Sequence, residues 1–365
     1  MNKSPRLVAL ETLYSIFYDG SYSNIALDKA LSDIKENKAF ISALVYGVTE
    51  KKITLDYFID KYAQGRIKPK VRIVLWLGAY QLLFMDKVPS SASINESVKL
   101  VKEIKQDYYS KLVNAVLHKI DNDRQIPDDL SVKYSVPENL INMWKKQYGE
   151  DVLNEFLPCI NDKPPLFAIP NKKFVNSDEL LYELECDGIL GEAYDEFVLI
   201  ENANDLTASK AFKNGLFYIE DLSSFNCANA LDALSDDLVL DMCSAPGGKA
   251  FTISQSMNNS GKIYCYDLHE HRLNLIKSSA KRLSIDNIYT DVNDATVYNE
   301  NIPKADKILC DVPCSGFGII RRKPEIRYKD LDSVKDLPQI QYKILETSSR
   351  YLKDGGRIIY STCTL

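Results

Sequence analysis

The sequence lacks long apolar runs and paired cysteines. Its longest apolar stretch, from Ile73 to Met85, is too short to cross a bilayer and contains Gln81, so no membrane span is expected. The eight cysteines include no C-x-x-C pair, which argues against a zinc site and is typical of reduced thiols in a cytoplasm. We therefore expect a cytoplasmic protein with no membrane partner and no metal.

A net positive charge is also missing, because the chain carries −6. The charge is distributed unevenly. Residues 1–125 carry 19 Lys and Arg against 14 Asp and Glu, residues 126–225 carry 8 against 19, and residues 226–365 carry 18 against 18. A nucleic-acid partner is therefore not excluded, and the N-terminal third is the segment expected to favour one.

The N-terminal third has the pattern of an all-α domain. Apolar residues recur at helical spacing from Leu7 to Ile120, and glycine or proline breaks the pattern at Gly20, Pro69 and Pro89. Ser93 and Glu96 have the spacing of a capping box that would open a helix. We predict a domain of several short-linked helices over residues 1–125, able to fold alone.

The remaining chain is predicted to contain two further parts. Residues 126–225 begin with helices and continue as a small α+β segment with a helix over 177–186, which we expect to face RNA. Residues 226–365 alternate strand and helix, the pattern of a parallel Rossmann-like sheet. The strands expected in it are 239–241, 262–267, 288–290, 305–310 and 356–360.

A glycine-containing loop follows the first of these strands. Paired glycines at the start of a helix let backbone N–H groups approach an anionic ligand group. Neither a G-x-x-x-x-G-K-[ST] nor a G-x-G-x-x-G motif is present near this strand, which disfavours a nucleoside triphosphate. Asp267 would hold two ribose hydroxyls and Asp294 an adenine amino group, so we predict an adenosyl cofactor. The loop residues expected to bind it are Cys243, Ser244, Ala245, Pro246, Gly247, Gly248 and Lys249.

Two cysteines follow the last two strands. Cys314 lies in Asp-Val-Pro-Cys-Ser-Gly after strand four, and Cys363 lies in Ser-Thr-Cys-Thr at the end of strand five. Because parallel strands end at one edge of the sheet, both thiols are expected in one cleft. For the other thiols that we considered, a buried structural role is the better interpretation. These are Cys159, Cys186, Cys227, Cys265 and Cys310.

These motifs resemble the RsmB/Sun (Fmu) family of RNA 5-methylcytosine methyltransferases, which act on small-subunit ribosomal RNA. The similarity covers the loop 241–249, the Pro-Cys motif 311–316, the basic segment 321–324 and the Thr-Cys motif 361–363. In the N-terminal third, residues 77–82 and 113–117 and the pair Asn95-Glu96 resemble the NusB-like RNA-binding domain of that family. The resemblance implies an all-α NusB-like domain followed by a Rossmann-like methyltransferase domain.

The resemblance also implies roles for individual residues. Cys363 would be the nucleophile that attacks carbon 6 of cytosine, and Cys314 would help remove the carbon 5 proton. Asp311, also at the cofactor, would hold or protonate ring nitrogen 3, with Lys249 orienting it. The implied cofactor is S-adenosyl-L-methionine and the implied partner is small-subunit ribosomal RNA, bound by a monomer. The residues expected to contact RNA are Asn171, Arg321, Arg322, Lys323, Arg327 and Lys329.

The chain departs from the family pattern in three respects, of which one is the strongly acidic segment 126–225. Ile169 stands where relatives usually have an arginine, and the chain stops at Leu365 where relatives continue into a strand hairpin, which would leave strand five as an exposed edge. Two alternatives therefore stay open: a transfer-RNA cytosine-5 methyltransferase, and a catalytically impaired RNA-binding or assembly protein. The Asp-Val-Pro-Cys motif excludes an exocyclic-amine methyltransferase, which would carry Asn/Asp-Pro-Pro-Tyr.

Overall fold

The computed structural model describes residues 3–202 and 206–364. By their contacts, these residues form two compact units. The first contains residues 3–163 and 316–331, and the second contains residues 164–315 and 332–364. The domain boundaries expected from the sequence, after residues 125 and 225, remain a prediction.

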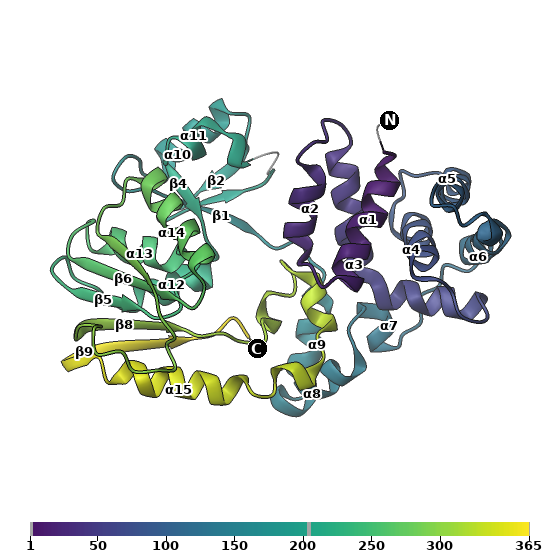
Figure 1. The fold of residues 1–365 in the computed structure, drawn as a ribbon. Helices are drawn as coiled ribbons and strands as arrows, with labels where there is room; N and C mark the ends of the chain where they lie inside the picture. The colour runs from purple at the N-terminus through teal and green to yellow at the C-terminus, as the bar shows by residue number, and fades with distance from the viewer. Residues whose placement is uncertain (1–2, 203–205, 365) are drawn as a thin grey trace. The chain divides into compact units, whose positions relative to one another are not determined.

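The first unit is helical throughout its described residues, which confirms the predicted all-α N-terminal domain (Figure 1). The predicted breaks lie at helix ends. Proline occupies the first turn of α4, where its missing N–H has no helical partner to lose. The helices are α1 (Pro5–Tyr18), α2 (Ser23–Leu31), α3 (Lys38–Tyr62), α4 (Pro69–Phe84), α5 (Ser90–Glu103), η1 (Asp107–Tyr109), α6 (Ser110–Asn122), α7 (Leu130–Tyr134), α8 (Glu138–Tyr148), α9 (Glu150–Cys159), η3 (Phe317–Ile319) and η4 (Pro324–Tyr328).

The capping box predicted at Ser93 and Glu96 is wrong. Helix α5 begins at Ser90, directly after Pro89, so Ser93 already lies inside the helix. The Ser93 side chain is buried, and its hydroxyl donates to the backbone oxygen of Gly78 (3.0 Å). The hydroxyl therefore links α5 to α4 and does not cap a helix end. The sequence alone does not show this contact between helices.

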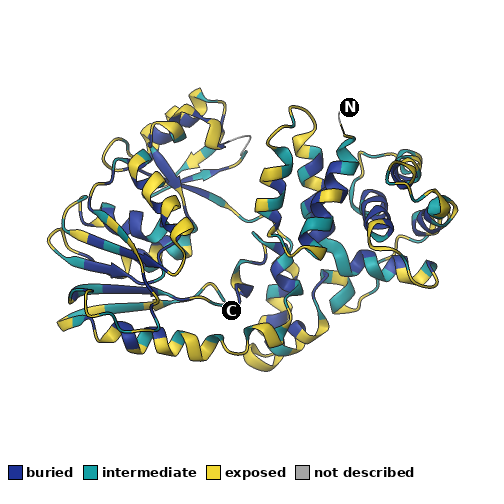
Figure 2. Cartoon of the chain, viewed as in Figure 1, coloured by how far each residue is buried: buried dark blue, intermediate teal, exposed yellow. Residues whose placement is uncertain are grey.

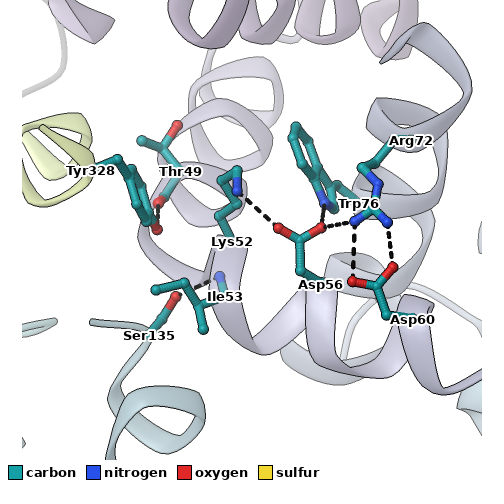
Figure 3. Close-up of polar contacts among 9 residues, drawn as sticks. All are labelled: Thr49, Lys52, Ile53, Asp56, Asp60, Arg72, Trp76, Ser135 and Tyr328. Atoms are coloured by element: carbon teal, nitrogen blue, oxygen red, sulfur yellow. Dashed lines mark hydrogen bonds and ion pairs between the residues drawn. The ribbon is translucent and has the colours of Figure 1, made fainter. Parts of the chain in front are cut away.

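Residues 316–331 are part of the first unit's core although they lie far along the chain. Arg327 is 1% exposed and donates through Nη1 to the backbone oxygens of Glu50 and Ser135 and to Oδ1 of Asn161, at 3.0–3.1 Å. The Tyr328 hydroxyl donates to the backbone oxygen of Thr49 (2.7 Å) (Figure 3). An isolated 1–125 fragment would lack these partners.

The turns of α3 beside Tyr328 are themselves held by a polar cluster (Figure 3). One Asp56 oxygen accepts from Trp76 Nε1 (2.7 Å) and from Arg72, while the other accepts from Lys52 (2.8 Å). The Lys52 ammonium also lies 5.4 Å from the centroid of the Tyr328 ring. These contacts bind Tyr328 to α3 through both its hydroxyl and its ring.

The second unit contains a small antiparallel sheet and a larger parallel one (Figure 1). The four-stranded sheet has the order β2-β3-β1-β4. Helix α10 begins with a capping box between Asn176 and Glu179, which confirms the helix predicted over 177–186. The strands of this small sheet and the helices between and after them are β1 (Leu166–Pro170), α10 (Ser177–Cys186), β2 (Gly191–Ala193), β3 (Val198–Ile200), η2 (Leu206–Ala208), α11 (Lys210–Lys213), β4 (Phe217–Ile219) and α12 (Leu222–Asn229).

The parallel sheet has the order β7-β6-β5-β8-β9, the arrangement of a Rossmann-like methyltransferase fold. All five strands predicted from the sequence are present. Among the described residues, β9 is the outermost strand on one side of the sheet. The elements are β5 (Leu238–Asp241), α13 (Gly248–Ser256), β6 (Lys262–Asp267), α14 (Glu270–Leu283), β7 (Ile288–Val292), β8 (Ala305–Asp311), η5 (Leu331–Val334), α15 (Leu337–Ser349) and β9 (Leu352–Ser361).

Alternating residues of the parallel sheet enter two different apolar cores. Val239 and Leu309 pack on the side of α12, α13 and α14, whereas Leu240 and Ile308 pack on the side of α15. Most of α15 remains exposed, and only a few of its residues are buried (Figure 2). Helices on both faces therefore leave the ends of the strands as the accessible part of the sheet.

Candidate active site at the carboxyl edge of the parallel sheet

Four strands end at one edge of the parallel sheet with a polar residue each. Asp241 ends β5, Asp267 ends β6, Asp311 ends β8 and Ser361 ends β9. The strands are parallel and hydrogen-bonded neighbours, so their carboxyl ends lie side by side. Ligands of open α/β sheets bind at this edge.

The loop from Cys243 to Lys249 follows β5 and opens α13. Gly247 has a φ of +108°, and a Cβ there would lie 2.8 Å from the Phe251 ring. A Cβ on Gly248 would lie 2.9 Å from a Glu220 oxygen. Position 247 therefore requires glycine, a side chain on Gly248 would displace the Glu220 carboxylate, and the first N–H groups of α13 are left for an anionic ligand group.

Backbone contacts hold the first part of this loop, Cys243 to Pro246, against the next strand and helix. The N–H of Ser244 donates to the backbone oxygen of Tyr266 (2.8 Å), and the oxygen of Ala245 accepts from Arg272 Nη2 (2.8 Å). Burial raises the pKa of Cys243 well above its usual value, so its thiol stays protonated. Cys243 is thus a mostly buried loop residue that favours the protonated form in the free protein.

Asp241 also lies at this edge. The sequence predicts that Asp241 ends a strand, but it was not among the residues expected to bind the cofactor. It is fully buried, and among the described residues no hydrogen bond of good geometry reaches its carboxylate oxygens, although the Ser244 hydroxyl and the N–H of Cys243 lie near enough to favour its charged form. Burial is the largest cause that raises its pKa to about 7. An unpartnered buried carboxylate of this kind is suited to a cationic or hydrogen-bond-donating ligand group.

The two acids predicted to hold the adenosine moiety lie in different surroundings. Asp267 is 3% exposed, with Oδ2 2.8 Å from Arg272 Nη1 and Oδ1 accepting from the N–H of His269 (3.0 Å). Asp294 is exposed, and its Oδ1 accepts from the N–H and hydroxyl of Thr296. The N–H of Asn293 donates to the backbone oxygen of Asp267 (3.2 Å), which brings the two segments together.

Asp311 is held by one donor on each oxygen. Lys249 Nζ lies 2.8 Å from Oδ2, and the Ser361 hydroxyl donates to Oδ1 (2.7 Å). The Lys249 ammonium also contacts the Ser224 hydroxyl (3.2 Å). Desolvation opposes the charge on Lys249, but the neighbouring Asp311 carboxylate raises its pKa overall, so the ammonium stays charged. The Lys249–Asp311 contact expected from the sequence is present.

Cys314 and Cys363 meet at this edge. Their sulfur atoms lie 3.0 Å apart in a thiol hydrogen bond, although 49 residues separate them in sequence. That hydrogen bond, followed by burial, raises the pKa of Cys363. Cys363 therefore favours the protonated form in the free protein, and it must lose its proton before it can act as a nucleophile.

The other cysteines follow the predicted structural role only in part. Cys265 and Cys310 are buried in the sheet, as predicted. Cys159 and Cys186 are exposed, and Cys227 is partly buried, so burial was the wrong prediction for these positions. Cys159 and Cys186 are the last residues of α9 and α10. The buried apolar positions of these helices are occupied by leucines, among them Leu157 and Leu184.

The residues predicted to contact RNA are divided between the surface and the interior. Arg321 is exposed, while Arg322, Lys323 and Lys329 are partly exposed. Arg327 is buried, and Asn171 is also buried, with its amide donating to the backbone oxygens of Gly215 (2.9 Å) and Leu283 (2.8 Å). We therefore assign Arg327 and Asn171 structural roles. Ile169, at the position of the relatives' arginine, is fully buried in β1.

Two negative findings apply to the described residues, 3–202 and 206–364. None of their helices is long and apolar enough to cross a membrane. No group of three or more His, Cys, Asp or Glu side chains among them could hold a metal ion.

Family models match the N-terminal third and the C-terminal part of the chain. The model of 16S rRNA methyltransferase RsmB/F matches residues 228–365, and the model of the NusB family matches residues 3–122. Together with the helical and Rossmann-like folds, these matches confirm the resemblance based on the loop 241–249 and the two cysteine motifs.

Curated relatives and a solved structure match nearly the whole chain. The probable ribosomal RNA small subunit methyltransferase B of Bacillus subtilis is 34% identical over 99% of this chain and 85% of its own length. The ribosomal RNA small subunit methyltransferase B of Escherichia coli O1:K1 is 28% identical over 99% of this chain and 86% of its own. The crystal structure of PH0851 has a TM-score of 0.83 and 26% identity, covering 100% of this chain and 87% of that one.

Proposed function

Because this chain belongs to the RsmB/F family of 16S rRNA methyltransferases, we propose that it methylates carbon 5 of a cytosine in small-subunit ribosomal RNA through a covalent cysteine adduct. The observation that carries the proposal is the contact between Cys314 and Cys363 beside the Lys249–Asp311 pair. Carbon 5 of cytosine is a weak nucleophile, and this site has the groups needed to activate it.

The chemistry uses two thiols in succession. Cys363, once deprotonated, adds to carbon 6 of the cytosine and makes carbon 5 electron-rich. Asp311 stabilises the ring as the adduct forms, and Lys249 holds the Asp311 side chain in place. Once carbon 5 carries the methyl group, Cys314, as the thiolate, would take the remaining carbon 5 proton, and the electrons of that C–H bond expel Cys363 as its thiolate. A paired cytosine would have to be flipped out of its helix to reach these groups.

The sheet edge fits S-adenosylmethionine, which supplies the electrophilic methyl group when bound. Asp241 offers buried, unpartnered anionic oxygens, and the loop Cys243–Lys249 offers N–H groups at the start of α13. Asp267 would hold the ribose and Asp294 the adenine. The carboxylate of Asp241 and the N-terminus of α13 have opposite charges and follow one another at this edge, which suits a ligand that carries both signs.

The RNA partner is proposed to contact two regions of the first unit. The N-terminal 125 residues carry an excess of five basic residues, from 19 Lys and Arg against 14 Asp and Glu. The second region is the exposed side of the segment after the Pro-Cys motif, with Arg321, Arg322, Lys323 and Lys329. We propose that the enzyme acts as a monomer in the cytoplasm.

Bisulfite sequencing of ribosomal and transfer RNA from cells with and without the gene tests the proposal. We expect one or more 5-methylcytosines of small-subunit ribosomal RNA to disappear in the deletion strain and to return with the wild-type gene. Loss of a transfer-RNA site instead would assign the substrate to the other class. An unchanged pattern in both RNAs would contradict the proposal.

Replacing Asp267 by alanine is expected to weaken cofactor binding by about 1–3 kcal/mol, the usual effect of unpairing a buried hydrogen-bonded group. Calorimetry with S-adenosylmethionine measures the change. Asp291, an exposed carboxylate at the end of the neighbouring strand β7, provides the matched control as Asp291→Ala. Unchanged affinity in the Asp267 variant would remove this residue from the site.

Cofactor affinity is expected to rise with pH through about 7. The pKa of Asp241 lies near 7, and a cationic ligand group binds the ionised carboxylate, so protonation at lower pH competes with binding. Between pH 8 and pH 6 we expect affinity to fall about tenfold, one factor of ten for each unit below the pKa. Asp241→Asn should remove this dependence. A wild-type affinity that is constant over this range would exclude Asp241 as the titrating group.

A further inference from the structure

Ser361 ends β9 directly beside the end of β8. Ser361 and Asp311 are register partners in the β8–β9 ladder, and the N–H of Val312 donates to the backbone oxygen of Ser361 (3.1 Å). The Ser361 hydroxyl lies 2.7 Å from Oδ1 of Asp311. Because a carboxylate can only accept, the serine is the donor, and the sheet fixes the backbone from which it donates.

Ser361 and Lys249 hold the Asp311 carboxylate in different ways. Lys249 binds Oδ2 with a positive charge, whereas Ser361 binds Oδ1 as a neutral donor. A carboxylate with a single donor can rotate about its Cβ–Cγ bond, and a second donor on the other oxygen fixes its plane. Asp311 keeps 30% of its side chain exposed, so its remaining lone pairs can reach a bound base.

The same serine joins the two cysteine-bearing segments. Cys314 lies three residues after Asp311, and Cys363 lies two residues after Ser361. The hydrogen bond between the Ser361 hydroxyl and the Asp311 carboxylate therefore connects the two segments close to their cysteines. The sulfur atoms of these cysteines lie 3.0 Å apart. A shift of the Ser361 side chain changes the position of Asp311 relative to both thiols.

We propose that Ser361 is a positioning residue of the methylation reaction: it orients the Asp311 carboxylate toward the cytosine at the moment when Cys363 attacks. The proposal rests on the function proposed above, because it assumes that Asp311 faces the base in the cysteine adduct. Ser361 itself contacts neither the base nor the methyl donor in this role. Its effect is on geometry, which catalysis depends on to within about 1 Å.

The test measures how fast the covalent adduct forms. In a Cys314→Ala background, where the adduct is expected to accumulate, Ser361→Ala should slow adduct formation about 10- to 100-fold, the effect of losing a hydrogen bond to a charged group. Ser361→Thr keeps a hydroxyl and should restore most of the rate. Single-turnover mixing with ribosomal RNA, followed by denaturing gel electrophoresis, gives the rate constant.

Two further measurements separate positioning from a structural role. The affinity for S-adenosylmethionine of Ser361→Ala should stay close to that of its parent, and its melting temperature should fall no further than the loss of one partly buried hydrogen bond explains, because the hydroxyl itself bonds Asp311 and no residue of the loop Cys243–Lys249. Ser349→Ala is the matched control. It removes a serine hydroxyl of the same unit, which donates to the backbone oxygen of Glu346 (2.8 Å) at the exposed end of α15, and it should leave the adduct rate unchanged.

An unchanged adduct rate in Ser361→Ala would overturn the proposal. So would equal losses in Ser361→Ala and Ser361→Thr together with a larger fall in melting temperature, since the residue would then support folding. Failure of the proposed function would appear earlier, in the Cys314→Ala parent. If that parent methylates nothing and forms no adduct, the cysteine chemistry is wrong, and the role of Ser361 falls with it.

Discussion

Replacing Cys363 by alanine is expected to abolish methylation, whereas replacing Cys314 by alanine is expected to trap the enzyme on its RNA. Only one thiol bonds to carbon 6, so without Cys363 the ring is never activated. Without Cys314 the attack still occurs, but the carbon 5 proton stays in place and Cys363 cannot leave. Transfer of a labelled methyl group measures the first effect, and a denaturing gel that retains a protein–RNA band measures the second.

The variant Cys186→Ala is the matched control for both. Cys186 is an exposed thiol at the end of α10, outside the site, so its loss should change neither readout. If the Cys363 variant forms the adduct and the Cys314 variant does not, the two roles are reversed. If each single variant retains methylation, neither thiol is the nucleophile.

Replacing Arg327 by alanine is expected to lower the free energy of unfolding by about 3 kcal/mol or more. The change removes the buried guanidinium of Arg327 from three acceptors: the backbone oxygen of Ser135, which is buried in this contact, and the backbone oxygen of Glu50 and the side chain of Asn161, which are partly buried. Denaturant unfolding followed by circular dichroism measures the loss. Arg327→Lys should restore little of it, since an ammonium cannot reproduce the planar guanidinium.

Arg321 is the matched comparison, because it lies in the same basic segment but is exposed. Arg321→Ala should leave stability within about 0.5 kcal/mol and weaken RNA binding instead. If Arg321 neutralises one phosphate of single-stranded RNA, its loss reduces the slope of log affinity against log salt by about 0.7. Equal destabilisation in the two variants would contradict the distinction drawn from their burial.

The elements of the fold follow closely from local sequence signals. The strand β6 has the predicted bounds, and α10 begins at the predicted residue because its capping box is formed by neighbours in the chain. The prediction at Ser93 failed for the opposite reason. Its hydroxyl bonds Gly78, a residue of another helix, and only the folded core shows that partner.

The candidate site shows the same division. Strand order alone predicts that Cys314 and Cys363 share a cleft, since parallel strands present their ends together, and the sulfur atoms do meet. Arg327 could not be separated from Arg321 by sequence, because both are arginines in one basic run. Burial among carbonyl oxygens, which is a property of packing, decides between a structural residue and a candidate RNA contact.

The long return of the chain to α3 has a consequence for synthesis on the ribosome. Glu50 and its partner Arg327 are 277 residues apart, so the helices of the first unit emerge long before the segment that completes their core. In the interval the ribosome makes β5, β6, β7 and β8, and these strands can begin to pair. Contacts between such distant residues slow folding, and α3 gains its contact with Arg327 only after these strands have been made.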